Sequence, residues 1–223
     1  MSIKLLLQAL AKFVLGMVAF FLLLFLPAGT LHYWNGWLLM GLLFVPMLLL
    51  GVFLWVKQPE LLKKRLHTKE GEAVQKSVIA WSALMFMASF LSAGLDFRYQ
   101  WTYIPRSIAM IAAVVFLCAY ALYAEVMREN AYLSRTVEVQ ENQQVIDTGL
   151  YGVVRHPMYF SVLLLFFSMP LVLQSWLSLL CMLPLPIILA KRIRNEEEVL
   201  KNGLAGYEDY MKRVKFRLIP LIW

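Results

Sequence analysis

The sequence contains few residues of the kinds that build soluble catalytic centres. There are two cysteines, Cys118 and Cys181, and three histidines among 223 residues. Both cysteines lie in apolar runs and have no cysteine or histidine at metal-ligand spacing, so we expect small buried hydrophobes and no metal site. The chain also lacks evident strands and a Gly-x-Gly-x-x-Gly turn after one. The absence of this glycine-rich turn excludes the dinucleotide-binding fold of soluble enzymes.

Charge is also scarce. Charged residues make up 16% of the chain and hydrophobic residues 61%, with a mean hydropathy of +0.67, whereas a soluble domain is roughly 45–50% apolar. The excess lies in long runs, which indicates one membrane domain. The formal net charge of +7 could suggest nucleic acid. However, the positive residues flank apolar runs and no nucleic-acid motif is present, so lipid headgroups explain them better.

Four apolar runs occupy the N-terminal half, at 13–26, 36–56, 77–95 and 105–126. The last three approach the ~20 residues that a helix needs to cross the hydrocarbon. The first has a basic start and ends at Pro27-Ala28-Gly29, a pattern that a signal peptide shares. Because five more runs follow, we favour a retained first span.

The stretch 158–190 contains 33 residues without a charge. One helix of that length would measure ~50 Å, too long for a ~30 Å hydrocarbon core. Pro170 and the polar pair Gln174-Ser175 interrupt it midway, so we predict a hairpin of two helices, with Pro184 and Pro186 distorting the second arm. The fold class is therefore all-α, with about six transmembrane helices.

Basic residues set the expected orientation. With six spans, one side of the membrane receives 19 of the 21 basic residues, and only Arg98 and Arg106 fall on the other. The positive-inside rule then places both termini in the cytoplasm, and we expect a prokaryotic plasma membrane. Four tryptophans fall at the predicted outer ends, as an aromatic belt requires: Trp34, Trp37, Trp101 and Trp176.

The tail 191–223 is polar and basic with one apolar stripe. The stripe has steps of four and three residues, which make one helical face: Leu200, Leu204, Tyr207, Met211 and Val214. Gly203 and Gly206 weaken a helix between them. We predict two short interfacial helices that fold back on the membrane domain.

Two polar runs flank the predicted hairpin. Pro157 fits the first turn of a helix, which places Arg155 and His156 where unpaired N–H groups favour an anion. Arg192 and Glu196 are four residues apart and share a helix face. The hairpin returns this pair to the side that holds His156. The alternative is structural: interfacial anchors and a solvated ion pair.

The order of these segments resembles the isoprenylcysteine carboxyl methyltransferase family and the related membrane phospholipid methyltransferases. The likeness covers roughly 136–223. In chain order the matching elements are Gly149-Leu150-Tyr151, Arg155-His156-Pro157-x-Tyr159, the uncharged hairpin, Arg192-x-x-x-Glu196-Glu197, Tyr207-x-x-Tyr210 and Ile219-Pro220. Ser161, where the family often has glycine, and Leu204-Ala205-Gly206, where Phe-Gly is common, depart from the pattern.

The resemblance implies an integral membrane methyltransferase that uses S-adenosylmethionine. It divides the single membrane domain 1–223 into four spans, 1–128, and a cofactor-binding region, 129–223. Arg192 matches the arginine assigned to the substrate carboxylate. The positions implied for cofactor binding are Gln140 (if a short gap is allowed), Val145, Ile146, Tyr151, His156, Tyr159 and Glu196. The implied partner is a lipophilic substrate entering from the bilayer, and the acceptor atom stays open between oxygen, nitrogen and sulfur.

Two other interpretations remain. Membrane steroid and sterol reductases, which bind NADPH, carry a similar Arg-His-Pro-x-Tyr segment. In the steroid reductases Gly-Glu often follows that tyrosine, whereas Phe160-Ser161-Val162 follows here. A non-enzymatic transporter component or scaffold is the third possibility. It predicts charged groups deep in the spans, and the second, third and fifth runs are almost free of them.

Overall fold

The computed structural model describes residues 3–66, 73–134 and 136–223, and the described residues form helices and loops without strands. Four single helices have the length and composition to span a membrane: α1 (Ile3–Ala28), α2 (Trp34–Lys57), α4 (Ala73–Tyr99) and α5 (Arg106–Glu129). The consecutive helices α7 (Trp176–Met182) and α8 (Leu185–Gly203) together form a fifth candidate span. α6 (Pro157–Val172) is apolar but shorter. The protein is a multi-pass all-α membrane protein, as predicted.

The first helix is longer than its apolar run. α1 begins at Ile3, before the apolar run, and ends at Ala28, within the Pro27-Ala28-Gly29 segment that the sequence indicated. Pro27 lies in the last turn of α1, where its missing N–H removes a backbone hydrogen bond. Gly29, whose φ is +68°, directly follows the last helical residue. α1 packs closely on α4 here, since a Cβ on Gly94 would lie 2.6 Å from the Leu24 carbonyl oxygen.

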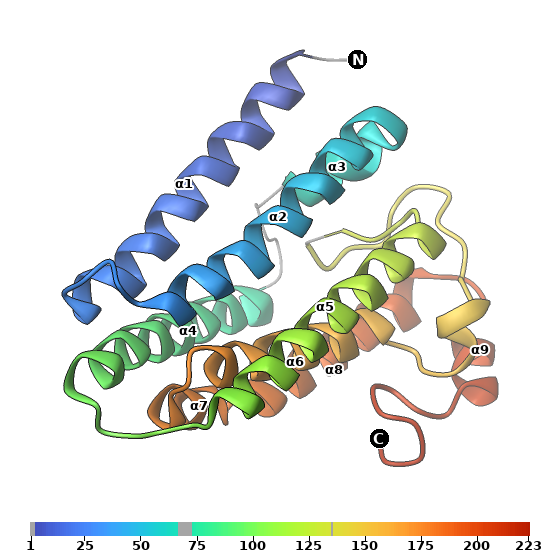
Figure 1. Cartoon of the computed structure of the whole chain (residues 1–223). Coiled ribbons are helices and arrows are strands. Elements are labelled where there is room, and N and C mark those ends of the chain that lie inside the picture. Colours follow the sequence, from blue (N-terminus) through green and yellow to red (C-terminus); the bar gives the residue numbers. More distant parts are fainter. Residues whose placement is uncertain (1–2, 67–72, 135) are drawn as a thin grey trace.

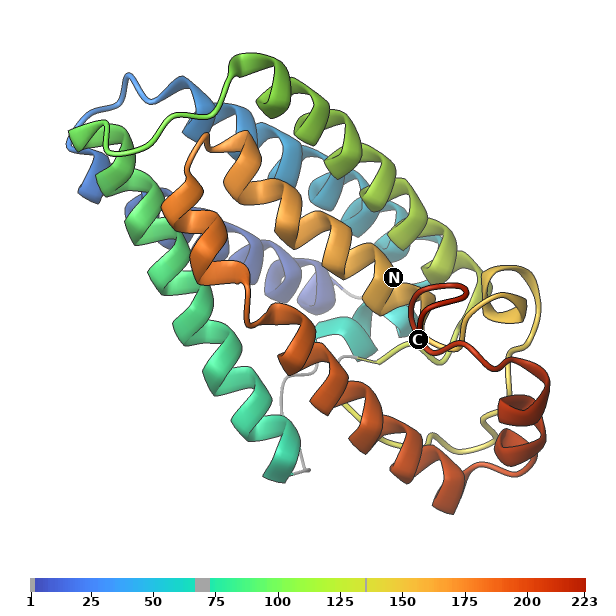
Figure 2. The same cartoon turned by 90° about the horizontal axis from the view of Figure 1, so that it is seen from below.

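The predicted hairpin is present. α6 runs through Pro170 to Val172, and the chain reverses at 173–175, where Gln174 has φ 58°. The second arm is broken between α7 and α8, beside Pro184, as its prolines predicted. Figure 2 shows α6 running antiparallel to the second arm. Both ends of 157–203 are therefore brought to the same end of the molecule.

The tail differs from the prediction of two short helices. Its first half continues α8 without a break to Gly203, because no glycine or proline interrupts 187–202. Only α9 (Tyr207–Arg213) is a separate short helix in the tail. The predicted apolar stripe is real: its five residues pack in one cluster with Tyr210, Val139 and Val145. The tail folds back as expected, since Arg155 N donates to Phe216 O at 2.9 Å.

The two ends of the bundle differ in character. Figure 1 shows the α1–α2, α4–α5 and α6–α7 connections gathered at one end, the end that carries the four predicted belt tryptophans. There Asp96, buried at the end of α4, accepts hydrogen bonds from Thr102 N at 2.7 Å and Ser175 Oγ at 2.5 Å. This carboxylate fastens the hairpin turn to the neighbouring loop.

The opposite end carries the polar segments. It contains α3 (Pro59–Leu66), which the sequence analysis did not predict, the loop 130–148, the short 3-10 helix η1 (Gly149–Gly152) and α9. Leu61 and Leu62 of α3 are buried against the ends of α2 and α5, in a cluster that also includes Tyr151. α3 thereby forms part of the wall behind the candidate site.

Candidate functional site

A cavity opens at this polar end, between the loop 130–146, η1 and the starts of α6 and α9, with α8 as its far wall. The space between its walls is ≈ 820 Å³, with the open solvent at its mouth included. Seven of the eight residues singled out from the sequence line it: Val145, Ile146, Tyr151, His156, Tyr159, Arg192 and Glu196. The predicted convergence of groups far apart in sequence is therefore observed.

Gln140 is the exception. It is not among the residues that line the cavity. Its side-chain Nε2 donates to Tyr132 O, and its backbone N–H donates to Gln143 Oε1 at 2.8 Å. Gln140 therefore forms hydrogen bonds that close its own loop, whereas Gln143 and Gln144 line the cavity.

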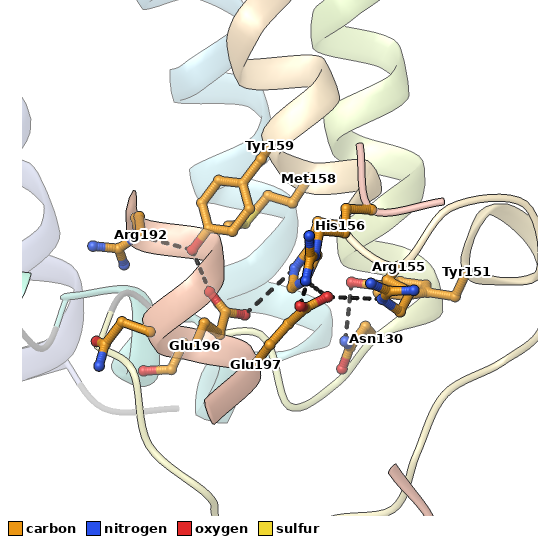
Figure 3. Close-up of polar contacts among 12 residues, drawn as sticks. Asn130, Tyr151, Arg155, His156, Met158, Tyr159, Arg192, Glu196 and Glu197 are labelled. Atoms are coloured by element: carbon orange, nitrogen blue, oxygen red, sulfur yellow. Dashed lines mark hydrogen bonds and ion pairs between the residues drawn. The ribbon is translucent and has the colours of Figure 1, made fainter. Parts of the chain in front are cut away.

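Tyr159 joins the two arms of the hairpin. Its hydroxyl donates to Glu196 and accepts from Arg192 Nε at 2.8 Å. Figure 3 shows this phenol between the guanidinium and the carboxylate. Arg192 also donates from Nη1 to Oε1 of Gln75, a fully buried α4 residue, at 2.9 Å. Because these bonds fix the guanidinium at the cavity wall, Arg192 is held in one orientation before any ligand binds.

Glu197 organises the other half of the site, and sequence reasoning missed it. Its carboxylate accepts from Arg155 Nε at 2.7 Å and Arg217 Nε at 2.8 Å, and lies 3.3 Å from His156 Nε2. Only 4% of its side chain is exposed. A signal was available, because Glu197 continues the four-residue spacing of the buried face of α8: Leu185, Leu189 and Ile193.

Arg155 precedes the first turn of α6 and lines the cavity, as expected, but its guanidinium is bonded to protein groups. Its guanidinium is buried, and it donates to Glu197, to Val214 O at 2.7 Å and to Lys215 O at 2.9 Å. The backbone N–H of His156 donates to Arg217 O at 2.8 Å. Arg155 therefore ties the C-terminal tail to α8. His156 occupies the N-cap position of α6 without a side-chain hydrogen bond to the helix, and its Nδ1 lies 4.0 Å from Glu196 Oε1.

The three consecutive glutamates have three different environments. Glu196 lines the cavity with 24% of its side chain exposed, Glu197 is buried, and Glu198 lies on the surface. On a helix, successive residues point about 100° apart, so adjacent carboxylates cannot share one face. Glu196 is thus the glutamate of this run that can meet a ligand in the cavity.

Tyr151 is fixed by its neighbours. Its hydroxyl accepts from Asn130 Nδ2 at 3.0 Å, and its carbonyl accepts from the Tyr210 hydroxyl at 2.8 Å. The turn before it requires glycine, because Gly149 has φ 52° and Glu129 Oε1 occupies the space of a Cβ. Burial raises the pKa of the Tyr151 phenol above its usual value. The hydroxyl therefore stays protonated.

Tyr207 is the unsatisfied group of the site. It lines the cavity and is buried, yet its hydroxyl has no hydrogen-bond partner among the described residues. Burial and then the charges of Glu197 and Glu196 raise its pKa, so it remains a donor. Buried polar groups almost always have a partner.

A carboxylate, two phenols and an imidazole facing one cavity suit a ligand that carries both a positive and a negative group.

Comparison with known proteins gives two findings. Residues 107–205 match the family model described as phospholipid methyltransferase, the family that includes the isoprenylcysteine carboxyl methyltransferases. The match extends from the start of α5 to just beyond α8, so it contains the hairpin and most of the cavity. The match supports a membrane methyltransferase and is consistent with the suspected relation to this wider family.

The second finding is a partial similarity to a reductase. The Delta(14)-sterol reductase of Mus musculus is 30% identical over 91 residues, which are 40% of this chain and 22% of the reductase. The aligned part thus spans about a fifth of that relative.

Proposed function

We propose, from the phospholipid methyltransferase match of residues 107–205, that the chain is an S-adenosylmethionine-dependent methyltransferase acting on a lipophilic acceptor, most like a prenylcysteine carboxylate. The observation that carries the proposal is the meeting of Tyr159, Arg192 and Glu196 across 37 residues of sequence. Its position at the polar ends of apolar helices suits an enzyme with one water-soluble and one lipid-soluble substrate.

The donor set of the cavity fits the cofactor. The Glu196 carboxylate can pair with its ammonium group, and the Tyr207 hydroxyl, a donor without a protein partner, can meet an acceptor atom. His156, at the N-terminus of α6, favours a carboxylate nearby. Tyr151 and Tyr159 offer aromatic surface. Val145 and Ile146 supply the apolar lining and backbone groups for the remaining part.

The protein's chemical task is orientation. When bound, the cofactor supplies a methyl group whose bond to a positively charged sulfur breaks as the acceptor–carbon bond forms, and the sulfur keeps the electron pair. A carboxylate acceptor is already ionised near neutral pH, so no general base is needed. It must be held in line at about 3–3.5 Å from the methyl carbon. Arg192, fixed by Gln75 and Tyr159, can supply a planar fork that holds two carboxylate oxygens.

The cavity is proposed to face the cytoplasm. The end of the bundle that carries it also carries most of the lysines and arginines in the described part of the chain. The positive-inside rule places such residues on the cytoplasmic side. Both termini would then be cytoplasmic. Reporter fusions at each terminus, or protease protection in sealed vesicles, test this orientation.

Two assays test the function. Isothermal calorimetry on the purified, folded protein should detect S-adenosylmethionine and its demethylated product, and absence of binding by both would overturn the cofactor assignment. A labelled-methyl transfer assay against a prenylcysteine analogue and extracted membrane lipids identifies the acceptor. If the product carries the label on nitrogen or sulfur, the carboxylate part of the proposal fails and the methyltransferase part stands.

A second candidate function is an NADPH-dependent sterol-type reductase, favoured by the partial similarity to the mouse enzyme. The segment that follows the shared tyrosine argues against the reductase function, because Phe160-Ser161-Val162 contains no carboxylate. NADPH fluorescence distinguishes the two: quenching or consumption by the purified protein favours the reductase, and no change leaves the methyltransferase.

A further inference from the structure

A second hollow lies on the membrane side of the molecule, where α1, α2 and α3 meet. Its walls are apolar side chains of α1 and α2, among them Phe13, Leu48 and Val52. Leu48 and Val52 are 42% and 47% exposed. An apolar groove open to lipid accepts a hydrocarbon chain without cost to its lining, because the chain replaces other hydrocarbon.

The end of this groove nearest α3 is polar and cationic. Lys12, Trp55 and Arg65 line it. The indole Nε1 of Trp55 and the Nε of Arg65 are buried N–H donors without a hydrogen-bond partner among the described residues. Arg65 also makes no ion pair with any carboxylate of the described residues. Two unsatisfied donors and a cation at one end indicate an anionic ligand atom there.

Arg65 connects this groove with the cofactor cavity. Its Nη1 lies 3.5 Å from Ser134 O and its Nη2 3.4 Å from Met158 Sδ, and both of these residues line the cavity. Trp55 and Leu62, from the groove, pack in the same cluster as Tyr151 and Met158. One layer of side chains therefore separates the two sites. Met158 is an unbranched, adaptable member of it.

We propose that the groove between α1, α2 and α3 holds the hydrocarbon chain of the methyl acceptor, and that Arg65 pairs with the acceptor's anionic headgroup, a carboxylate or a phosphate, at the boundary with the cofactor cavity. That the ligand of this groove is a methyl acceptor rests on the proposed methyltransferase function. The apolar walls hold the chain, and the Arg65 cation pairs with the head next to side chains that also line the cofactor cavity.

Gly51 provides a test that leaves the backbone intact. It lies in α2 on the groove, and a Cβ added there meets nothing within 4 Å. Gly51→Leu therefore fills the groove and removes a helix-weakening residue. Gly41→Leu is the matched control, because Gly41 is also in α2, also has open space around it, and lines a different hollow.

The probe is a sixteen-carbon fatty acid with a diazirine near the end of its chain, photoactivated on the whole protein in nanodiscs and mapped by mass spectrometry. We expect label on α1 and α2 within the groove, a loss of about tenfold in Gly51→Leu, and no loss in Gly41→Leu. Equal labelling of the two variants, or label spread over other lipid-facing helices, overturns the proposal.

Arg65→Gln tests the headgroup with alkyl carboxylate, phosphate and alcohol probes of equal chain length. In Arg65→Gln, the apparent affinity for the carboxylate or for the phosphate probe should fall about tenfold, and that for the alcohol should stay unchanged. The probe that loses affinity shows which anionic headgroup Arg65 binds. Equal loss for all three overturns the role of Arg65. These assays need no S-adenosylmethionine, so failure of cofactor binding in the calorimetry leaves their result unaffected. In an active enzyme, Gly51→Leu should raise the acceptor's KM at unchanged cofactor Kd.

Discussion

Glu197 of α8 lies 2.7 Å from Arg155, 42 residues earlier in the chain, with both side chains almost fully buried. The same carboxylate holds Arg217 of the tail at 2.8 Å. One anion thus joins the segment before the hairpin, its second arm and the C-terminal segment. The neighbouring Glu196 is left to face the cavity, so structural and ligand-facing roles are divided between adjacent residues.

Glu197→Gln should destabilise the protein even when no ligand is bound. Removing one partner of a buried ion pair leaves Arg155 uncompensated, at a cost of about 3–5 kcal/mol. Thermal unfolding in detergent measures the effect as a lower midpoint. Glu198→Gln, at the exposed neighbouring position, should leave the midpoint unchanged. Equal midpoints for the two variants would contradict the joining role of Glu197.

Glu196→Gln should weaken S-adenosylmethionine binding about tenfold, because a charge-assisted contact to the ammonium group becomes a neutral one. Its unfolding midpoint should change far less than that of Glu197→Gln, since Glu196 is partly exposed and its protein partner is the Tyr159 hydroxyl. Calorimetry with the cofactor gives the affinity. Wild-type affinity in this variant would remove Glu196 from the cofactor site.

Arg192→Ala should retain cofactor affinity and lose methyl transfer by about 100-fold or more, because the acceptor is no longer held in line. Binding is followed by calorimetry and turnover by labelled methyl transfer. The control is Arg194→Ala, two residues away on the exposed side of α8, which should keep both. Should Arg192→Ala lose affinity and turnover equally, Arg192 belongs to the cofactor site instead.

Tyr207→Phe should be neutral or slightly stabilising in the ligand-free protein, because the hydroxyl it removes has no partner among the described residues. Cofactor affinity should fall about three- to tenfold if that hydroxyl donates to the ligand. Tyr210→Phe provides the contrast. It removes the bond to the Tyr151 carbonyl and should cost about 1 kcal/mol of stability. An unchanged cofactor affinity in Tyr207→Phe would show that the hydroxyl is not a ligand contact.

Much of the fold could be predicted from local patterns. Runs of apolar residues define the spans because bilayer thickness sets their length. Gln174-Ser175 marked the hairpin turn because this polar pair interrupts an uncharged stretch that is too long for one span. Boundaries were less predictable. α1 began well before its apolar run and α8 ran on past Ala190, because tertiary contacts and the absence of a breaker decide where a helix begins and ends.

The candidate site divides in the same way. The sequence alone determined that His156, Tyr159, Arg192 and Glu196 come to one end of the bundle, because a hairpin of fixed length must return to the side it left. Only the tertiary structure decided that Glu197 is paired with Arg155 and Arg217, and that Gln140 lies outside the cavity. Those outcomes depend on which face of α8 the tail covers and how the loop 130–148 closes. Both are contacts between distant segments that no local pattern encodes.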